Sequence, residues 1–396
     1  MDQNQDRRYD VLIVGGGIAG SVAAWTFSRQ GLSVALIDER DFAAPFFRAE
    51  RISSLAIADL RDLGLGKLID EVALPLETTA VIKGGKVQRV THEVDYSVPL
   101  WQLVNRIRES LKENPLVDFI SDVVESVETG VDRQAVFLKK GQRELCGKLL
   151  VVATGSSTAF LKMIGVEREI ISKNHSSTFG FDLIPGPDFE LPASSVTIRI
   201  CREGADYMNV FPTPEGGYRA NLFTYWNASD AVQKEFVKGD STALLKRLSP
   251  SLMNSTGSWT VGDTLECGAV SVMKSTGYEQ PGFVLIGDAY GRICPCCGRG
   301  INKVIRDVLT LQKLVSAWIA GDVALTPEVL ASYYHDDTRE AYEEWVYTQS
   351  LTLRERIVES TPKQVLRRII YHHLPPKLQD FYWKHLGSRK RVPIAQ

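Results

Sequence analysis

Residues 9–20 of the chain read YDVLIVGGGIAG, an apolar run that leads directly into closely spaced glycines. The run predicts a strand buried on both faces, because strands covered by helices on each side read as continuous hydrophobic segments. Gly15, Gly17 and Gly20 have the spacing G-x-G-x-x-G, which permits a tight turn, close backbone approach to a pyrophosphate and close helix packing. A helix over about residues 19–29 would direct its positive N-terminal end at the phosphates. The stretch therefore predicts a dinucleotide site.

The segment after this helix supports the same interpretation. Residues 32–37 predict a second strand that ends in Asp38. An acidic residue about twenty positions beyond the glycines is expected to bind a ribose hydroxyl. The residues that we expect to line the nucleotide are Gly15, Gly17, Ile18, Ala19, Gly20, Asp38, Glu39 and Arg40.

A second glycine-rich segment lies far along the chain, where residues 283–302 read FVLIGDAYGRICPCCGRGIN. Residues 283–286 predict another buried strand, and the residues after them fit the spacing G-D-A-x5-P-x2-G-x-G-x-N. The two segments together indicate FAD. They indicate a chain that leaves the nucleotide-binding fold and later returns to it.

Composition and charge restrict the class of protein. The chain has 396 residues, of which 44% are apolar, enough for a large core or for two joined domains. The net charge of -2 gives no reason to expect a nucleic-acid partner. No apolar run approaches the length of a membrane-spanning helix, and the polar start of the chain lacks a secretory hydrophobic region. We therefore expect a cytoplasmic protein whose six cysteines are thiols.

The last residues of the chain are strongly basic. Residues 361–396 hold eight Lys or Arg residues and one acid, Asp380, which gives this tail a net charge of +7. Such a tail could dock an acidic partner or an anionic membrane surface. A solvated helix that packs against the acidic remainder of the chain is the alternative that we favour.

The pattern along the chain predicts the fold class α/β: a GR2-type Rossmann-like FAD-binding domain, an inserted, mostly antiparallel β-sheet for the substrate, and a helical C-terminus. Residues 53–70 predict one helix, and Thr326-Pro327 and Thr361-Pro362 each predict a helix start. The expected boundaries are 1–75, 100–165 and 281–325 for the discontinuous FAD-binding domain, 76–99 and 166–280 for the substrate-binding domain, and 326–396 for the helical region.

The two glycine motifs together resemble those of the para-hydroxybenzoate-hydroxylase-like flavoproteins. That superfamily includes aromatic monooxygenases, geranylgeranyl-reductase-like enzymes and flavin-dependent halogenases. The resemblance implies that Asp288 binds the ribityl chain and that backbone N–H groups near the start of the last long helix face the flavin. It implies an arginine near the flavin phosphates, either Arg48 or its rival Arg51. The further residues that it assigns to FAD are Gln102, Thr154, Gly155, Pro295, Gly298, Gly300, Ile301 and Asn302.

The chain also departs from the family pattern. Family hydroxylases carry an Asp-Gly motif, linked to flavin and reduced-nicotinamide handling, where this chain has Ala153-Thr154-Gly155. NAD(P)H is the expected reductant, although the chain lacks the aspartate of this motif, which the family uses in handling the nicotinamide. The halogenase motif Trp-x-Trp-x-Ile-Pro is missing as well, so a two-component halogenase is not expected.

In a flavin hydroxylase the cofactor performs the oxygen chemistry, so the protein does not require a dedicated acid–base pair, and none is evident in this sequence. The candidates for a catalytic role are His175, Tyr207, Asn209, Tyr225, Cys294 and Cys297. Cys294 and Cys297 have the C-x-x-C spacing of redox thiols, although small residues that line a tight loop would give the same pattern. No metal site is expected, because no histidine is close to these cysteines in the sequence.

Three functions fit these observations. The first is an FAD-dependent monooxygenase that acts on an aromatic or unsaturated small molecule through a flavin C4a-hydroperoxide, as the resemblance implies. The second is a flavin oxidase, dehydrogenase or geranylgeranyl-reductase-like enzyme, with a variant that modifies a residue of a partner protein docked on the basic tail. The third is a flavin-binding protein without catalytic activity.

Overall fold

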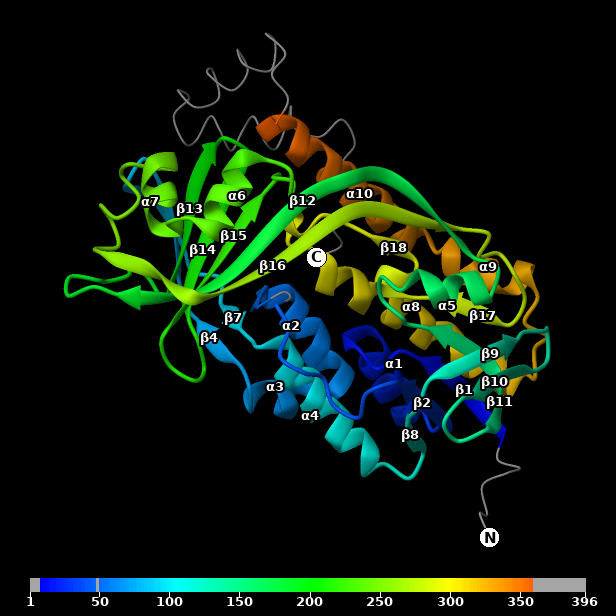
Figure 1. The fold of residues 1–396 in the computed structure, drawn as a ribbon. Coiled ribbons are helices and arrows are strands. Elements are labelled where there is room, and N and C mark those ends of the chain that lie inside the picture. The colour runs from blue at the N-terminus through cyan, green and yellow to red at the C-terminus, as the bar shows by residue number, and fades with distance from the viewer. Residues whose placement is uncertain (1–7, 48–49, 359–396) are drawn as a thin grey trace.

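The computed structural model describes residues 8–47 and 50–358. Arg48, the basic tail over residues 361–396 and the expected helix start at Thr361-Pro362 lie outside the described residues. Two large sheets organise the chain (Figure 1). One belongs to the nucleotide-binding part and the other to the inserted part, and this arrangement is the predicted α/β fold class.

The first sheet has seven strands, and its central strands are parallel. Its strands are β1 (Arg8–Val14), β2 (Val34–Asp38), β8 (Val117–Ser121), β9 (Val124–Glu128), β10 (Gln134–Leu138), β11 (Arg143–Val152) and β17 (Phe283–Leu285). The order is β8-β2-β1-β11, after which the first half of β11 pairs with β10 and its last residues pair with β17. The chain therefore returns to this sheet at β17, as the second glycine segment predicted.

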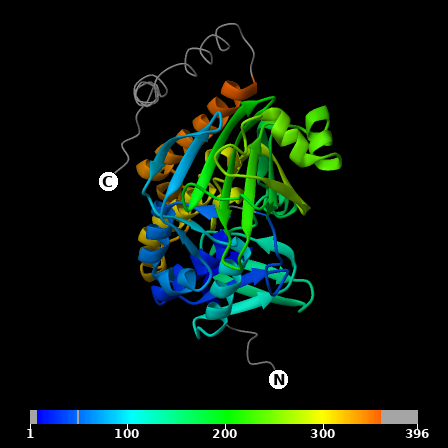
Figure 2. The same ribbon diagram turned by 90° about the vertical axis from the view of Figure 1, so that its left-hand side faces the viewer.

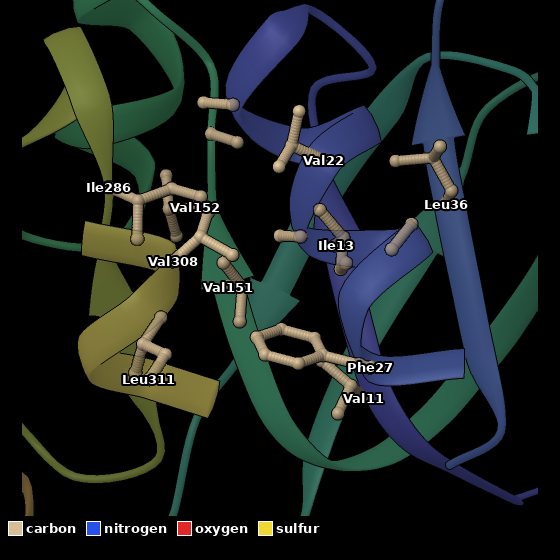
Figure 3. Packing of buried hydrophobic residues seen from close by; sticks show 14 of the residues in the cluster. Val11, Ile13, Val22, Phe27, Leu36, Val151, Val152, Ile286, Val308 and Leu311 are labelled. Carbon is tan, nitrogen blue, oxygen red and sulfur yellow. The ribbon is translucent and has the colours of Figure 1, made fainter. Parts of the chain in front are cut away.

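Helices α1 (Ile18–Arg29) and α8 (Gly300–Ala320) pack against each other beside this sheet. Figure 3 shows their shared core, where Phe27 and Val22 of α1 and Val308 and Leu311 of α8 meet strand residues such as Val151. All five side chains are fully buried. Because α1 and α8 begin at the two glycine segments, their packing brings both segments to the same edge of the sheet.

Other helices surround the nucleotide-binding part. These are α2 (Ser54–Leu60), η1 (Arg61–Leu65), α3 (Gly66–Asp70), α4 (Leu100–Lys112), α5 (Thr158–Met163), α9 (Pro327–Tyr334) and α10 (Asp337–Val358). The single helix expected over residues 53–70 is wrong in one respect, because Gly64 takes a φ of 85° and interrupts it. The N-cap expected at Thr326 is confirmed, since its side chain accepts a hydrogen bond from the Val329 N–H.

The second sheet has eight strands in the order β18-β16-β12-β15-β14-β13-β5-β6. Their bounds are β5 (Thr79–Lys83), β6 (Lys86–Thr91), β12 (Glu167–Pro185), β13 (Ser195–Arg202), β14 (Ala205–Pro212), β15 (Tyr218–Thr224), β16 (Trp259–Thr276) and β18 (Gly291–Arg292). Strands β12 and β16 pair along most of their length and run from the second sheet across to the nucleotide-binding part (Figure 1). In Figure 2 the second sheet stands above the nucleotide-binding part, with α10 along one side.

One face of the second sheet carries a separate core, in which Phe179, Met208 and Leu222 pack with Phe236 and Leu245. Phe236 and Leu245 belong to α6 (Ala231–Lys238) and α7 (Ser241–Leu248), which cover this face. A small sheet of β3 (Arg51–Ile52), β7 (Asp95–Ser97) and β4 (Leu74–Leu76) completes the fold. Within the described ranges, no helix is both long enough and apolar enough to cross a membrane.

Candidate functional site

The first glycine turn joins β1 to α1 and has a geometry that only glycine allows at two positions. Gly15 has a φ of 102°, and a Cβ built there would lie 2.4 Å from the carbonyl oxygen of Ala153. A Cβ on Gly20 would lie 1.8 Å from the carbonyl oxygen of Gly15. A Cβ on Gly17, by contrast, would meet no atom within 4 Å. Gly15 and Gly20 thus allow neighbouring backbone segments to pack closely, whereas Gly17 faces open space.

Asp38 at the end of β2 is joined to this turn. Its Oδ2 accepts a hydrogen bond of 2.7 Å from the Gly16 N–H, and its Oδ1 accepts one of 3.0 Å from the Arg40 N–H. Arg108 of α4 lies 3.1 Å from the same Oδ2 and donates to the carbonyl oxygens of Gly16 and Arg40 at 2.8 and 2.9 Å. Glu39 and the Arg40 side chain are exposed, and they form a loose ion pair at 3.8 Å.

Arg108 is a residue that the sequence analysis missed. It is 4% exposed, and its guanidinium connects the glycine turn to the end of β2. A signal for it exists in the sequence, because Val104, Arg108 and Leu111 are spaced as one face of a helix. A charged residue within such an apolar stripe predicts a buried partner.

The second glycine segment lies at the ends of β11 and β17. Arg168 of β12 bridges them, donating to the carbonyl oxygens of Asp288 at 2.7 Å and of Gly155 at 2.9 Å. Its Nε and the hydroxyl of Thr154 are buried and have no hydrogen-bond partner among the described residues. The Asp288 side chain is 40% exposed and lies 3.9 Å from Arg292. Polar groups that can bind a ligand are therefore left free beside this turn.

The start of α8 closes the same region. Pro295 opens the short helix η3 (Pro295–Cys297), and Gly298 follows it with a φ of 64°. A Cβ on Gly298 or on Gly300 would meet no atom within 4 Å. Asn302, one position after Ile301, is 8% exposed, and its Nδ2 has no partner in the part of the chain that the structure describes. The N–H groups at a helix start favour a negatively charged ligand, because the helix dipole is positive there.

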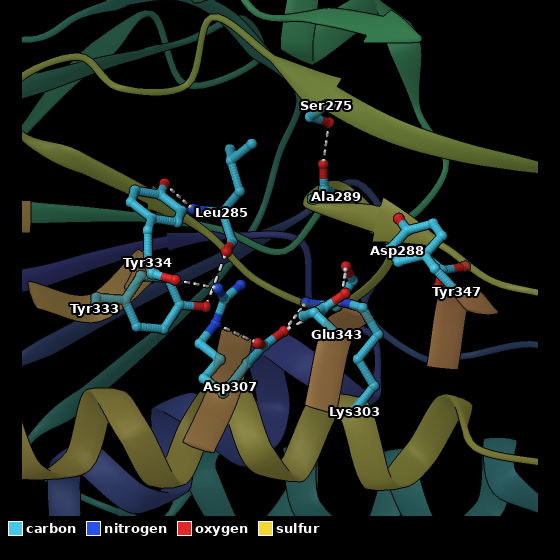
Figure 4. A network of polar contacts seen from close by, with 12 residues as sticks. Ser275, Leu285, Asp288, Ala289, Lys303, Asp307, Tyr333, Tyr334, Glu343 and Tyr347 are labelled. Carbon is cyan, nitrogen blue, oxygen red and sulfur yellow. Dashed lines mark hydrogen bonds and ion pairs between the residues drawn. The ribbon is translucent and has the colours of Figure 1, made fainter. Parts of the chain in front are cut away.

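A buried network of charges supports Gly287, the first residue of the turn η2 (Gly287–Ala289) (Figure 4). Its N–H donates to Asp307 Oδ2 at 2.7 Å, and its carbonyl oxygen accepts from Lys303 Nζ at 3.0 Å. Arg339 of α10 donates to Asp307 at 2.8 Å, and Glu343 lies 2.7 Å from Lys303. Two positive and two negative groups thus balance within a buried space, which fixes the backbone of the turn.

The other residues expected at the cofactor are Gln102 and one of two arginines. Gln102 of α4 donates a hydrogen bond to Glu215, in the loop between β14 and β15. Arg48 lies outside the described residues. Its rival Arg51 is engaged elsewhere: it pairs with Asp95 and donates to Asn209 Oδ1 at 3.3 Å.

The face of the second sheet opposite α6 and α7 carries the other candidate residues. Tyr207 donates to the carbonyl oxygen of Cys296 at 3.0 Å and stacks on Phe223 with ring centroids 4.5 Å apart. Burial raises the pKa of the Tyr207 hydroxyl well above its ordinary value, so the hydroxyl stays protonated. Asn209, two positions along β14, accepts a hydrogen bond of 2.8 Å from Thr197.

A cavity of about 440 Å³ lies at the far end of this face. Its charged lining is centred on Arg219, which contacts Glu50 at 3.1 Å, Asp182 at 3.2 Å and also Glu266. Burial raises the pKa of Glu50, although Arg219 opposes this. The aromatic residues that line the cavity are Phe46, Trp101, Phe211 and Tyr218. Trp101 lies in the first turn of α4, the helix whose Arg108 holds the first glycine turn.

The cysteine segment before Gly298 packs between the second sheet and α10. The sulfur of Cys294 lies 3.4 Å from the hydroxyl oxygen of Ser176 on β12. His175, the residue before Ser176, is fully buried and stands edge-on to Tyr225 at 5.8 Å. Cys297 directs its thiol at the carbonyl oxygen of Cys294, 2.8 Å away. The cysteines of the described residues are all free thiols, and no group of side chains there has the arrangement of a metal site.

Comparison with known proteins gives a consistent result. A family model described as an FAD binding domain matches residues 8–346. Kynurenine 3-monooxygenase from Dictyostelium discoideum is 25% identical over 327 residues, which cover 76% of this chain and 68% of that protein. Digeranylgeranylglycerophospholipid reductase 1 from Methanopyrus kandleri is 23% identical over 333 residues, which cover 80% of each chain. The crystal structure of p-nitrophenol 4-monooxygenase from Pseudomonas putida is similar with a TM-score of 0.74 at 18% identity, and the match covers 97% of this chain and 99% of that one.

Proposed function

Because this chain belongs to the family of FAD-binding proteins whose model matches residues 8–346, and is an FAD-dependent oxidoreductase, we propose that it is a monooxygenase that hydroxylates an aromatic or otherwise unsaturated small molecule. The observation that carries the proposal is the aromatic cavity on the second sheet. Helix α4 contributes Trp101 to this cavity and Arg108 to the glycine turn, so one rigid element supports both places.

The edge where the glycine segments meet fits FAD. Gly17, Gly298 and Gly300 face open space there, and Thr154, Arg168 and Asn302 have buried polar atoms without partners. Asp38 stands at the end of β2, where an acid can bind a ribose hydroxyl. We assign the nucleotide half of FAD to the first segment, and the ribityl chain and flavin to Asp288 and the start of α8. Gly155 and Pro295 belong to the same proposed site.

FAD, when bound, supplies the activation of oxygen. The chain itself would bind and orient the substrate and exclude water. Phe211, Tyr218 and Trp101 offer flat apolar surfaces for an aromatic ring, and the carboxylates around Arg219 can accept hydrogen bonds from it. Tyr207 would contribute a protonated hydroxyl, which donates a hydrogen bond to the Cys296 carbonyl. Asn209 and Tyr225 would shape the same face of the sheet.

The decisive experiment uses the flavin-loaded enzyme, NADPH or NADH, and a panel of phenols, anilines and unsaturated acids under labelled dioxygen. A substrate of a monooxygenase accelerates oxidation of the nicotinamide and takes one labelled oxygen atom into its product. NAD(P)H as the direct reductant is part of the proposal. Rapid flavin reduction without labelled product from any compound would contradict hydroxylation of these substrate classes.

A second function is favoured by a specific observation. The chain has Ala153-Thr154-Gly155 at the end of β11, where family hydroxylases have an acid, and its relative from Methanopyrus kandleri is named as a reductase. A flavin oxidase, dehydrogenase or geranylgeranyl-reductase-like enzyme would therefore be the alternative, and it could act on a residue of a partner protein held by the basic tail. Failure of both nicotinamides to reduce the flavin, with reduction by a partner protein, would support it.

We also propose that the protein is located in the cytoplasm.

A further inference from the structure

The cavity on the second sheet has two kinds of wall. One wall is aromatic, formed by Phe46, Trp101, Phe211 and Tyr218. The other wall is charged, and its charged residues within the described ranges are four carboxylates and one guanidinium: Glu50, Asp182, Glu215, Glu266 and Arg219. Because the carboxylates outnumber the guanidinium, the field inside the cavity favours a positively charged ligand.

The guanidinium of Arg219 is more deeply placed than the carboxylates around it. Only 9% of the Arg219 side chain is exposed, against 35% for Glu266 and 66% for Asp182. Phe47 lies over the guanidinium, 5.9 Å from it, and a Cβ built on Gly180 of β12 would lie 2.7 Å from its Nη2. The positive group is thus packed against protein, and the negative groups are those that a ligand meets first.

The hydrogen bonds of Arg219 lead to the same conclusion. Its Nε donates to both oxygens of Glu50 at 3.1 Å, its Nη1 donates to Asp182 at 3.2 Å, and its Nη2 donates to Glu266. Each nitrogen of the guanidinium is therefore already engaged with a carboxylate. The carboxylates keep capacity for more donors, because each carboxylate has about four acceptor positions. A substrate carboxylate would have to displace a partner of Arg219, whereas an ammonium group finds its acceptors in place.

The charged wall is not fully neutralised within the protein. Burial raises the pKa of Glu50, the Arg219 guanidinium opposes this rise, and the Glu266 carboxylate adds to it. Glu215, in the loop between β14 and β15, accepts a hydrogen bond from Gln102 and makes no ion pair with any residue that the structure describes. A bound cation relieves the repulsion between such neighbouring carboxylates.

The aromatic wall favours the same class of ligand. A cation is attracted to the face of a tryptophan or tyrosine ring, and Trp101 and Tyr218 line the cavity together with Asp182 and Glu215. Aromatic side chains also pack against the ring of a substrate. The cavity volume of about 440 Å³ is within the range of small-molecule sites. An aromatic ring that carries an amine can therefore use both walls at once.

We propose that the substrate of this cavity is an aromatic amine in its protonated form, with its ring against the aromatic wall and its ammonium group against Asp182, Glu215 and Glu266. This inference rests on the proposed function, because it takes the cavity to be the substrate site. The site itself is the cavity with its aromatic wall, and the carboxylates determine which charge it accepts. The same carboxylates repel an aromatic acid, whose charge has the sign of the wall.

The test measures binding separately from turnover, with three phenols that differ in charge. Tyramine carries an ammonium group, 4-ethylphenol carries no charge, and 4-hydroxyphenylacetate carries a carboxylate. In calorimetric titrations of the flavin-loaded enzyme without nicotinamide, we expect a Kd for tyramine about tenfold below that of 4-ethylphenol, and weaker binding of the acid. Added salt should narrow the difference. Binding of 4-hydroxyphenylacetate as tight as that of tyramine would overturn the proposal.

Variants show whether the carboxylates select the ligand. Asp182→Asn and Glu215→Gln each remove one charge from the wall, and each should weaken tyramine binding about threefold while leaving 4-ethylphenol unaffected. Glu235→Gln is the matched control, since Glu235 lies on α6, beyond the opposite face of the sheet, and pairs with Arg247 at 3.1 Å. It should keep the full preference for tyramine. A preference that survives both wall substitutions together, in an enzyme that still holds its flavin, would overturn the role of the carboxylates.

Labelled dioxygen separates this proposal from hydroxylation itself. Preferential binding of tyramine without a labelled product would support the cationic ligand and contradict its hydroxylation. Labelled product from 4-hydroxyphenylacetate in preference to tyramine would support hydroxylation and overturn the choice of a cationic substrate.

Discussion

At the scale of single residues, the glycines of the first turn divide into two kinds. Gly15 and Gly20 are required by the chain itself, since a Cβ at either would collide with backbone atoms. Gly17 has open space where its side chain would be. Sequence spacing alone groups these glycines together, and only the surrounding backbone shows that they do different things.

This difference gives a matched pair of substitutions. Gly17→Val should fold with the melting temperature of the flavin-free enzyme but retain no FAD, because its side chain fills the space where the backbone approaches the pyrophosphate. Gly20→Ala should destabilise the fold by about 1–3 kcal/mol, because its Cβ forces the turn away from α1. Flavin absorbance and thermal unfolding measure the two effects. A Gly17→Val enzyme that binds FAD normally would contradict the proposed site.

Arg108 is the clearest example of a residue whose role is visible only in the tertiary structure. Removing it in Arg108→Met leaves Asp38 without its buried partner and takes away one of the two donors to the Gly16 carbonyl, the other being the Ser21 hydroxyl. This should cost about 3 kcal/mol and weaken FAD retention. Arg106→Met on the same helix is the control, since Arg106 makes exposed ion pairs with Glu71 and Glu109. Its melting temperature should match that of the wild type. Equal effects of the two substitutions would argue against the role of Arg108.

At the scale of elements, the strands and helices next to the glycine motifs were predictable because local pattern and tertiary role agree there. The long helix expected after the second glycine segment is α8, and the strand expected over residues 283–286 is β17. The helix over residues 53–70 was predicted as continuous because its apolar spacing continues through Gly64. The helices α6 and α7 were not anticipated, since they are short and lie within a region of strand patterns.

The contact between α8 and α10 carries a prediction of its own. Asp307→Ala removes the acceptor for the Gly287 N–H and the partner of Arg339, leaving a buried positive charge. We expect a loss of about 3–5 kcal/mol in the free energy of unfolding, together with loss of flavin. Asp307→Asn keeps an oxygen for Gly287 and should retain more flavin than the alanine variant. Urea unfolding and flavin absorbance provide both readouts.

A control for this network lies between α9 and α10, where His335 follows the last residue of α9. His335 is exposed and contacts Glu340 at 3.4 Å and Glu279 at 3.8 Å. Surface contacts of this type contribute little, so His335→Ala should behave as the wild type in both measurements. If Asp307→Ala also left stability and flavin unchanged, the network would not support the turn at Gly287.

At the scale of the whole molecule, the fold class and the meeting of the two glycine segments followed from the sequence because both motifs begin helices at strand ends. The side chains that support the second segment could not be predicted in this way. Arg168 of β12 donates to the Asp288 carbonyl oxygen, and Arg339 of α10 donates to Asp307, which in turn holds Gly287. No local pattern marks such contacts. The cavity likewise combines side chains from α4, β14 and β15, which only the assembled fold brings together.

Buried carboxyl groups at the interfaces between these parts predict a pH dependence. Burial raises the pKa of Glu50, Asp206 and Glu343 in the folded protein. The folded state therefore binds protons that the unfolded state releases, so their stabilising effect is present at low pH and is lost as pH rises through the raised values. For Glu50 this loss begins above its ordinary pKa of 4.5.

Glu50→Gln isolates one of these groups. The amide keeps the shape of the carboxyl but cannot ionise, so the free energy of unfolding of the variant relative to the wild type should rise as the pH increases above 4.5. The gain measures how far the folded pKa of Glu50 lies above its ordinary value, at about 1.4 kcal/mol for each pKa unit. Urea unfolding of the flavin-free proteins at several pH values measures it. A difference that stays flat across this range would show that Glu50 ionises alike in both states.

The pairing of β11 with β17 also sets when the protein can acquire its cofactor during synthesis. The first glycine turn leaves the ribosome early, but Gly287 and the start of α8 are translated only after β16, the last long strand of the second sheet. A nascent chain therefore carries half of a nucleotide site throughout the synthesis of the inserted domain. Long-range pairing of this kind closes late, because the intervening chain must first be ordered. We therefore expect only chains translated past the end of α8 at Ala320 to bind flavin, and products truncated before that point should remain colourless.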